Sequence, residues 1–113
     1  MALQQAAPAA RFGWMAIRAL AASTTVAFAE EMAFRGYLLK ALPFATWFAV
    51  LASSVAFGLT HGDRWFAATL AGICYALVFL RKGRIAEAVV AHGITNALIA
   101  AQVLILQTWR LWT

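Results

Sequence analysis

Long apolar runs alternate with short polar interruptions along this chain, and each run has roughly the length of a membrane helix. The runs cover residues 12–40, 46–60, 65–80 and 85–107. Crossing the hydrocarbon core of a bilayer takes about 20 helical residues. The pattern predicts four principal helices, and we expect the third to be short or to cross incompletely.

Proline, glycine and basic residues mark the boundaries between these runs. Pro43 ends the first helix because proline lacks the amide hydrogen and disfavours helix in the preceding residue. Polar turns at residues 61–64 and 81–84 separate the later helices. We therefore predict an all-α fold, a polytopic membrane helix bundle. Residues 1–11 form a short N-terminal tail and residues 12–113 one core.

Composition supports a membrane location. The chain is 65% hydrophobic and only 12% charged, whereas a soluble domain carries about a quarter charged residues. Its net charge of +5 comes from basic residues that occur singly or flank apolar runs. That pattern favours anchoring at lipid headgroups over binding of nucleic acid. The single cysteine, Cys74, excludes an internal disulfide and a cysteine-based zinc cluster.

The up-and-down order of helices predicts which residues lie at each membrane face. Four tryptophans fall near one face: Trp14, Trp65, Trp109 and Trp112. The basic turn at residues 81–84 falls with Lys40 at the other. The positive-inside rule makes the second face cytoplasmic, although Arg11, Arg64 and Arg110 oppose this orientation.

Charged residues interrupt the first apolar run at Glu30, Glu31 and Arg35. Each costs roughly 2.5–3.5 kcal/mol within a membrane segment, and such residues usually face the bundle interior and serve function. Glu31 and Arg35 are four residues apart and can form an ion pair on one helical face. Glu30 points about 100° away and stays uncommitted. We predict Glu30 as the general base, supported by the Glu31–Arg35 pair.

Two further pairs at helical spacing add candidate chemistry: Phe57 with His61, and His92 with Asn96. Glu30, His61 and His92 could hold zinc or another divalent metal in a three-ligand open site. Alternatively, His61 could help Glu30 activate water directly, while His92 and Asn96 donate hydrogen bonds to the oxyanion. Phe57 is expected to serve packing. The spacing leaves both mechanisms open.

Purely structural roles are also consistent with these residues. A histidine on a membrane helix often only donates an interhelical hydrogen bond. Depth in an upright bundle also raises a difficulty. Measured from the Lys40 side at 1.5 Å per residue, Glu30 lies about 15 Å deep, His92 about 10 Å and His61 about 22 Å. A common site therefore requires a tilted second helix or one that begins later.

At these residues the chain resembles the CPBP family, which comprises CAAX prenyl endopeptidases and bacteriocin-processing enzymes and is also called Abi. The family hallmarks are EExxxR, FxxxH and HxxxN on successive membrane helices. All three occur here in the same order, as Glu30-Glu31…Arg35, Phe57…His61 and His92…Asn96.

The resemblance implies an intramembrane endopeptidase with an all-helical core at residues 12–113. In such an enzyme Glu30 activates water, His61 and His92 complete the site, and Asn96 helps to stabilise the oxyanion. Family names often include "metalloprotease", but a mechanism without metal is also implied, so the cofactor stays open. The expected substrate is a membrane-associated peptide or protein, and the expected location is the bacterial inner membrane.

Length is where the chain departs from the family pattern. Family members usually carry additional membrane helices ahead of the motifs, and this chain begins one helix before them. It resembles a minimal core or the protease portion of a longer or fused protein that supplies those helices. Two other functions stay in view: a non-catalytic immunity or partner-binding protein on the same scaffold, and a helical subunit of a transporter.

Overall fold

The structure, a computed structural model, describes residues 5–108 and 111–112, and within them it contains helices and no strand. The first helical rod consists of α2 (Pro8–Ala21), the π-helix η1 (Ala22–Val26), α3 (Ala27–Glu31), the π-helix η2 (Met32–Leu38) and α4 (Leu39–Ala41). Then follow α5 (Thr46–Leu59), the 3₁₀ turn η3 (Gly62–Arg64), α6 (Trp65–Lys82) and α7 (Ile85–Leu106). The predicted all-α bundle of four principal helices is confirmed.

Three of the helical segments are long and apolar enough to cross a membrane: Pro8–Ala41, Gly62–Lys82 and Ile85–Leu106. The expectation that the third helix is short was wrong, because α6 continues through Arg81 and Lys82 before it ends. The short helix is α5, whose 14 residues span roughly 21 Å. Leu42 adopts an extended conformation ahead of Pro43, as expected for a residue that precedes proline.

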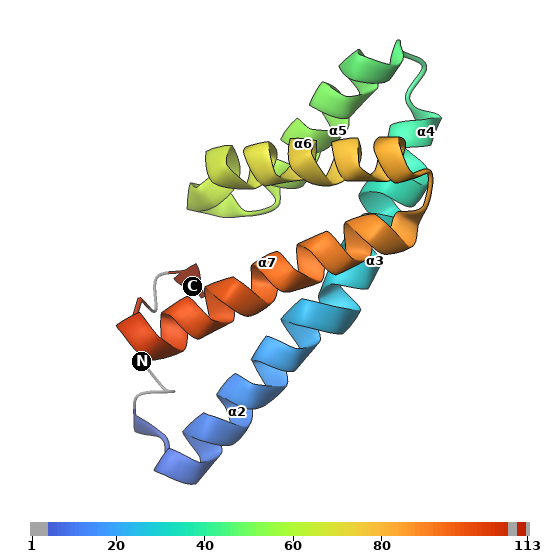
Figure 1. Ribbon diagram of the computed structural model, residues 1–113. Coiled ribbons are helices and arrows are strands. Elements are labelled where there is room, and N and C mark those ends of the chain that lie inside the picture. Colours follow the sequence, from blue (N-terminus) through green and yellow to red (C-terminus); the bar gives the residue numbers. More distant parts are fainter. Residues whose placement is uncertain (1–4, 109–110, 113) are drawn as a thin grey trace.

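Figure 1 shows the rod, α7 and the α5–α6 pair meeting at one end of the molecule, while α2 and α7 diverge towards the other. The apolar core lies at the meeting end and contains buried residues of α4, α5, α6 and α7: Leu39, Ala49, Val50, Ala76, Phe79 and Ala88. Many large apolar side chains elsewhere are exposed, as expected for surfaces that face lipid. Trp109 and Arg110 of the predicted interfacial residues lie outside the described part.

Small residues allow the helices to approach closely. A Cβ atom on Gly58 of α5 would lie 1.9 Å from Thr69 Oγ1 and 2.5 Å from the Trp65 carbonyl oxygen of α6. Helix interfaces in membranes are rich in such residues because apolar burial does not drive association there and close packing does. Gly83 ends α6 in a left-handed conformation (φ 70°), with its N–H bonded to the Phe79 carbonyl.

We predict that Gly58→Ala destabilises the fold by about 1–3 kcal/mol, because the added methyl group overpacks the α5–α6 contact. Thermal unfolding in detergent, followed by circular dichroism, measures the effect. Gly13→Ala is the matched control, since a Cβ there meets nothing within 4 Å. Equal unfolding temperatures for the two variants would show that α5 and α6 lie further apart.

Candidate active site

The predicted polar residues converge on one cavity of about 450 Å³, a volume typical of ligand sites. Five of the predicted site residues line it: Glu30, Phe57, His61, His92 and Asn96. They come from α3, from α5 and the turn after it, and from α7. Glu31 and Arg35 are fully buried beside it. The structure therefore brings together residues that lie up to 66 positions apart (30 to 96).

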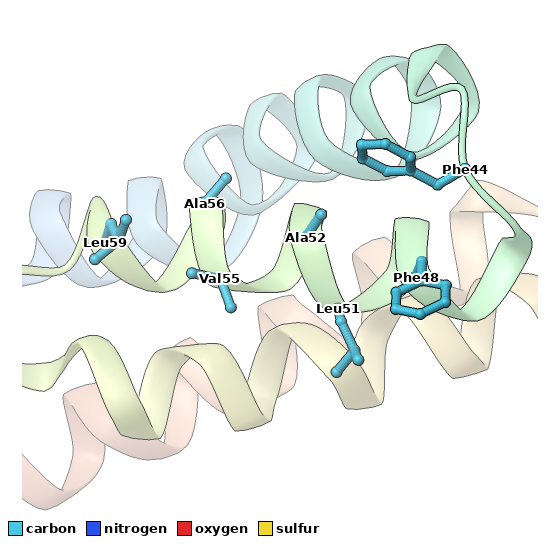
Figure 2. Close-up of a pocket in the computed structure, with 7 residues that line it drawn as sticks. All are labelled: Phe44, Phe48, Leu51, Ala52, Val55, Ala56 and Leu59. Atoms are coloured by element: carbon cyan, nitrogen blue, oxygen red, sulfur yellow. The ribbon is translucent and has the colours of Figure 1, made fainter.

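A second, apolar hollow lies elsewhere on the molecule. It measures about 830 Å³ and follows the face of α5 that Figure 2 shows, with Phe44 and Phe48 near one end and Leu59 near the other. Ala52 and Ala56 point towards the first helical rod in that view. All of its lining side chains are apolar. No group there can transfer a proton or polarise a carbonyl, so size alone does not locate the site.

His61 lines the same cavity as Glu30 and His92, although α5 begins at Thr46 as the upright estimate assumed. Depth along one helix is then not comparable with depth along another, and the upright estimate that separated His61 from the other residues was wrong. Phe57 lies between the two histidines. Its ring centre is 4.7 Å from that of His61 and 5.5 Å from that of His92. Phe57 therefore packs against both imidazole rings and helps to position His61, which is four residues after it.

Beside the cavity lies the predicted ion pair. Arg35 Nη1 donates to Glu31 Oε1 at 3.1 Å, and both side chains are excluded from solvent. Arg35 Nη2 donates to the Gly72 carbonyl of α6 at 2.6 Å. The guanidinium also packs over the Phe57 ring at 4.7 Å. A Cβ atom on Gly72 would lie 2.9 Å from that Nη2, so glycine leaves the space in which Arg35 meets α6.

His92 links the two glutamates. Its Nδ1 lies 2.7 Å from Glu31 Oε1, and its Nε2 lies 3.3 Å from Glu30 Oε2. The prediction that Glu30 stays uncommitted was therefore wrong, because its partner comes from α7 and not from its own helix. Tyr75 of α6 stacks on the imidazole at 4.6 Å with the planes 13° apart. These contacts fix both the plane and the rotation of the His92 ring.

The number of available protons limits the hydrogen bonds that Glu30, Glu31 and His92 can form with one another. An ionised carboxylate only accepts hydrogen bonds, and a neutral imidazole has a single N–H donor. Two carboxylates facing both nitrogens of one ring therefore require an imidazolium or a proton on one of the carboxyl groups. With His92 donating to Glu31, one proton is held between His92 Nε2 and Glu30. A proton shared by His92 and Glu30 therefore lies next to the cavity.

The two neighbouring glutamates have different access to solvent. The Glu30 side chain is 28% exposed, whereas that of Glu31 is 0% exposed. Glu30 lines the cavity and is the one acidic residue that does so among the described residues. It is thus the carboxylate that water or substrate can reach.

Asn96 is held by the first rod. Its Nδ2 donates to the Ala22 carbonyl of η1 at 2.7 Å. A Cβ atom on Gly93 would lie 2.4 Å from the Ser23 carbonyl oxygen, so glycine permits the close crossing of α7 with η1. The π-helix offers the carbonyl at this crossing, and π-segments are frequent at functional sites. One Nδ2 hydrogen of Asn96 is left for the cavity.

Sequence reasoning missed several residues of the site. Tyr75 could have been noticed, because a tyrosine within an apolar span needs a partner for its hydroxyl group. Ser23 and Thr24, which do not line the cavity, could have indicated the irregular helix that holds Asn96. Their hydroxyl groups donate to the Ala19 and Leu20 carbonyls at 2.8 and 2.7 Å, and such back-bonding often bends a helix. Nothing in the sequence pointed to Arg18 as a cavity residue.

The three residues predicted to bind metal are Glu30, His61 and His92. His61 Nδ1 lies 2.9 Å from the Phe57 carbonyl and 3.1 Å from Thr60 Oγ1, so this nitrogen has partners within its own turn. Over the described residues, no group of three His, Cys, Asp or Glu side chains is arranged to hold a metal ion. Glu30, His61 and His92 do not form a metal site in this arrangement, and metal binding stays a prediction.

Comparison with known proteins places the chain in a family. A family model described as "Type II CAAX prenyl endopeptidase Rce1-like" matches residues 12–98, which include every residue of the three motifs. The chain belongs to the Rce1-like family. No curated protein and no solved structure gives a significant match. Membership of a membrane protease family, together with three helices able to span a bilayer, makes the chain an integral membrane protein.

We predict that Arg35→Ala lowers stability by roughly 3–5 kcal/mol, because it leaves the Glu31 carboxylate buried without its counter-charge. Folded yield and thermal stability in detergent report the loss. Arg84→Ala is the control. It breaks an ion pair with Glu87 whose side chains are 74% and 36% exposed, and such pairs contribute about 1 kcal/mol at most. If Arg35→Ala were as stable as Arg84→Ala, the buried pair would be dispensable.

Proposed function

We propose that this Rce1-like protein is an intramembrane endopeptidase that hydrolyses a peptide bond in a membrane-associated protein or peptide. The observation that carries the proposal is the contact of His92 with both Glu30 and Glu31 at a cavity inside a bundle of apolar helices. Buried ionisable groups of this kind are costly in a membrane protein and usually mark function. Membership of the family supports the same reaction class.

In the proposed mechanism Glu30 is the general base. Water hydrogen-bonded to Glu30 attacks the carbonyl carbon of the scissile bond, and Glu30 takes up the proton that the water loses. The carbon–nitrogen bond then breaks, and the same proton passes to the leaving amine. His92 orients the Glu30 carboxylate and shares its proton, since its Nε2 lies 3.3 Å from Glu30 Oε2. Proton transfer by a positioned carboxylate typically contributes 10²–10⁴-fold to such a rate.

His61 and Asn96 complete the proposed site in different ways. If His61 Nδ1 donates to the Phe57 carbonyl, the neutral ring presents Nε2 as an acceptor, which suits a second group that holds the attacking water. The remaining Nδ2 hydrogen of Asn96 suits the oxyanion. This proposal gives His92 a positioning role and moves it away from the oxyanion role expected from sequence, because both of its nitrogens have carboxylate partners.

The bacterial inner membrane is the proposed location, with the basic turn at residues 81–84 on the cytoplasmic side. Lys40 Nζ lies 5.3 Å from the centre of the Phe79 ring near the end of α6. Lys40 and the basic turn are therefore at the same end of the bundle, which supports the sidedness of the basic residues.

We expect Glu30→Gln to reduce cleavage by about 10²–10⁴-fold with folding intact, because the amide keeps the shape but cannot accept the proton. Mass spectrometry of membrane proteins co-expressed with each variant follows the products. Glu87→Gln, which changes an exposed carboxylate of α7, serves as control and should cleave normally. Near-native cleavage by folded Glu30→Gln would remove Glu30 from the mechanism and leave Glu31 as the next candidate.

Direct activation of water by Glu30 predicts that cleavage survives removal of metal. Purified protein is dialysed against a chelator, its metal content is measured by mass spectrometry, and cleavage is then assayed. Retained activity in metal-free protein is the expected result. About one metal per chain, with activity lost on chelation and restored by zinc, would instead show that the reaction depends on metal, with Glu30, His61 and His92 as the candidate ligands after rearrangement.

A further inference from the structure

Two basic residues also line the cavity that contains Glu30. Arg18 of α2 and Arg64 of η3 both line it. Neither takes part in an ion pair with any residue that the structure describes. A guanidinium without an ion pair favours neutral oxygen acceptors, and Arg18 already holds one.

Arg18 binds a peptide segment of this chain. Its Nη2 donates to the backbone carbonyl of Trp112, 94 positions away in sequence. The guanidinium carbon also lies 4.9 Å from the centre of the Trp112 ring. Arginine suits both contacts, because its planar group donates in fixed directions and stacks on aromatic faces. Leu111 and Trp112 themselves line the cavity.

A continuous path joins this contact to the catalytic end. Arg18, Ala22, Val26 and Glu30 line the cavity at intervals of four residues along the first rod. Ala67, Ala68 and Ala71 of α6 also line it, and their short side chains leave room for a bound chain. Arg18 and Glu30 are about 18 Å apart along the helix axis. That distance corresponds to roughly five residues of extended peptide.

We propose that Arg18 forms a substrate subsite for an aromatic side chain and the carbonyl oxygen of the same residue, about five residues from the scissile bond. Residues 111–112 occupy this subsite and compete with substrate for it. The inference rests on the proposed peptidase function and adds a class of substrate to it, namely membrane-associated peptides with an aromatic residue at that spacing.

Binding to the Glu30→Gln variant tests the subsite without cleavage. The probes are two fluorescently labelled apolar ten-residue peptides that differ only by tryptophan or alanine at one position, and fluorescence anisotropy in detergent gives their Kd values. In the Glu30→Gln, Trp112→Ala protein, where the subsite is vacant, the tryptophan peptide should bind about 3- to 30-fold more tightly than the alanine peptide. It should also bind more tightly there than to protein that keeps Trp112.

Adding Arg18→Leu should abolish the preference, whereas Arg11→Leu should retain it. The control removes the same charge from the same helix at a residue that does not line this cavity. Equal affinity for the two peptides in the vacated protein, or no measurable binding of either, overturns the subsite. A preference that survives Arg18→Leu also overturns it. Failure of the peptidase proposal is separate, because it is read as absent cleavage by the wild-type protein and leaves these Kd values unaffected.

Discussion

Arg35 and Glu31 carry opposite charges in a part of the bundle that solvent does not reach, and the need to satisfy both charges organises the site. The guanidinium donates to Glu31 within the first rod and to the Gly72 carbonyl of α6. The carboxylate oxygen that pairs with Arg35 also lies 2.7 Å from His92 Nδ1 of α7. One buried pair therefore ties three helices together. Breaking it would leave a charge without a partner in a medium of low dielectric, which is strongly unfavourable.

The same arrangement gives the adjacent residues Glu30 and Glu31 different surroundings. Glu31 is fully buried and holds His92, while Glu30 lines the cavity and faces the other nitrogen of the same ring. Different surroundings commonly give two nearby carboxylates different roles in one active site. The contacts depend on close helix crossings. Gly72 makes room for the guanidinium, and Gly93 lets α7 approach the Ser23 carbonyl.

The elements that depend on local pattern were predictable from sequence, and the contacts between helices were not. Apolar runs gave the four helices, and the i,i+4 rule gave the Glu31–Arg35 pair. The contact of His92 with Glu31 joins residues 61 positions apart and depends on how closely α7 crosses the rod, which periodicity does not report. Whether His61 reaches the cavity depends on how α5 packs against the rest of the bundle. The contact of Trp112 with Arg18 joins residues 94 positions apart. Roles in catalysis stay predictions, because geometry identifies what can transfer a proton and not what does.

The central claim is that Glu30 and His92 act as one unit, and a double-mutant cycle on the cleavage rate tests it most directly. Glu30→Gln, His92→Gln and the double variant are compared with the wild-type protein under the same conditions. Residues that act as a unit are strongly non-additive. The account predicts that the double variant loses about as much activity as the more damaging single variant. Losses that multiply, as they do for independent sites, would contradict it.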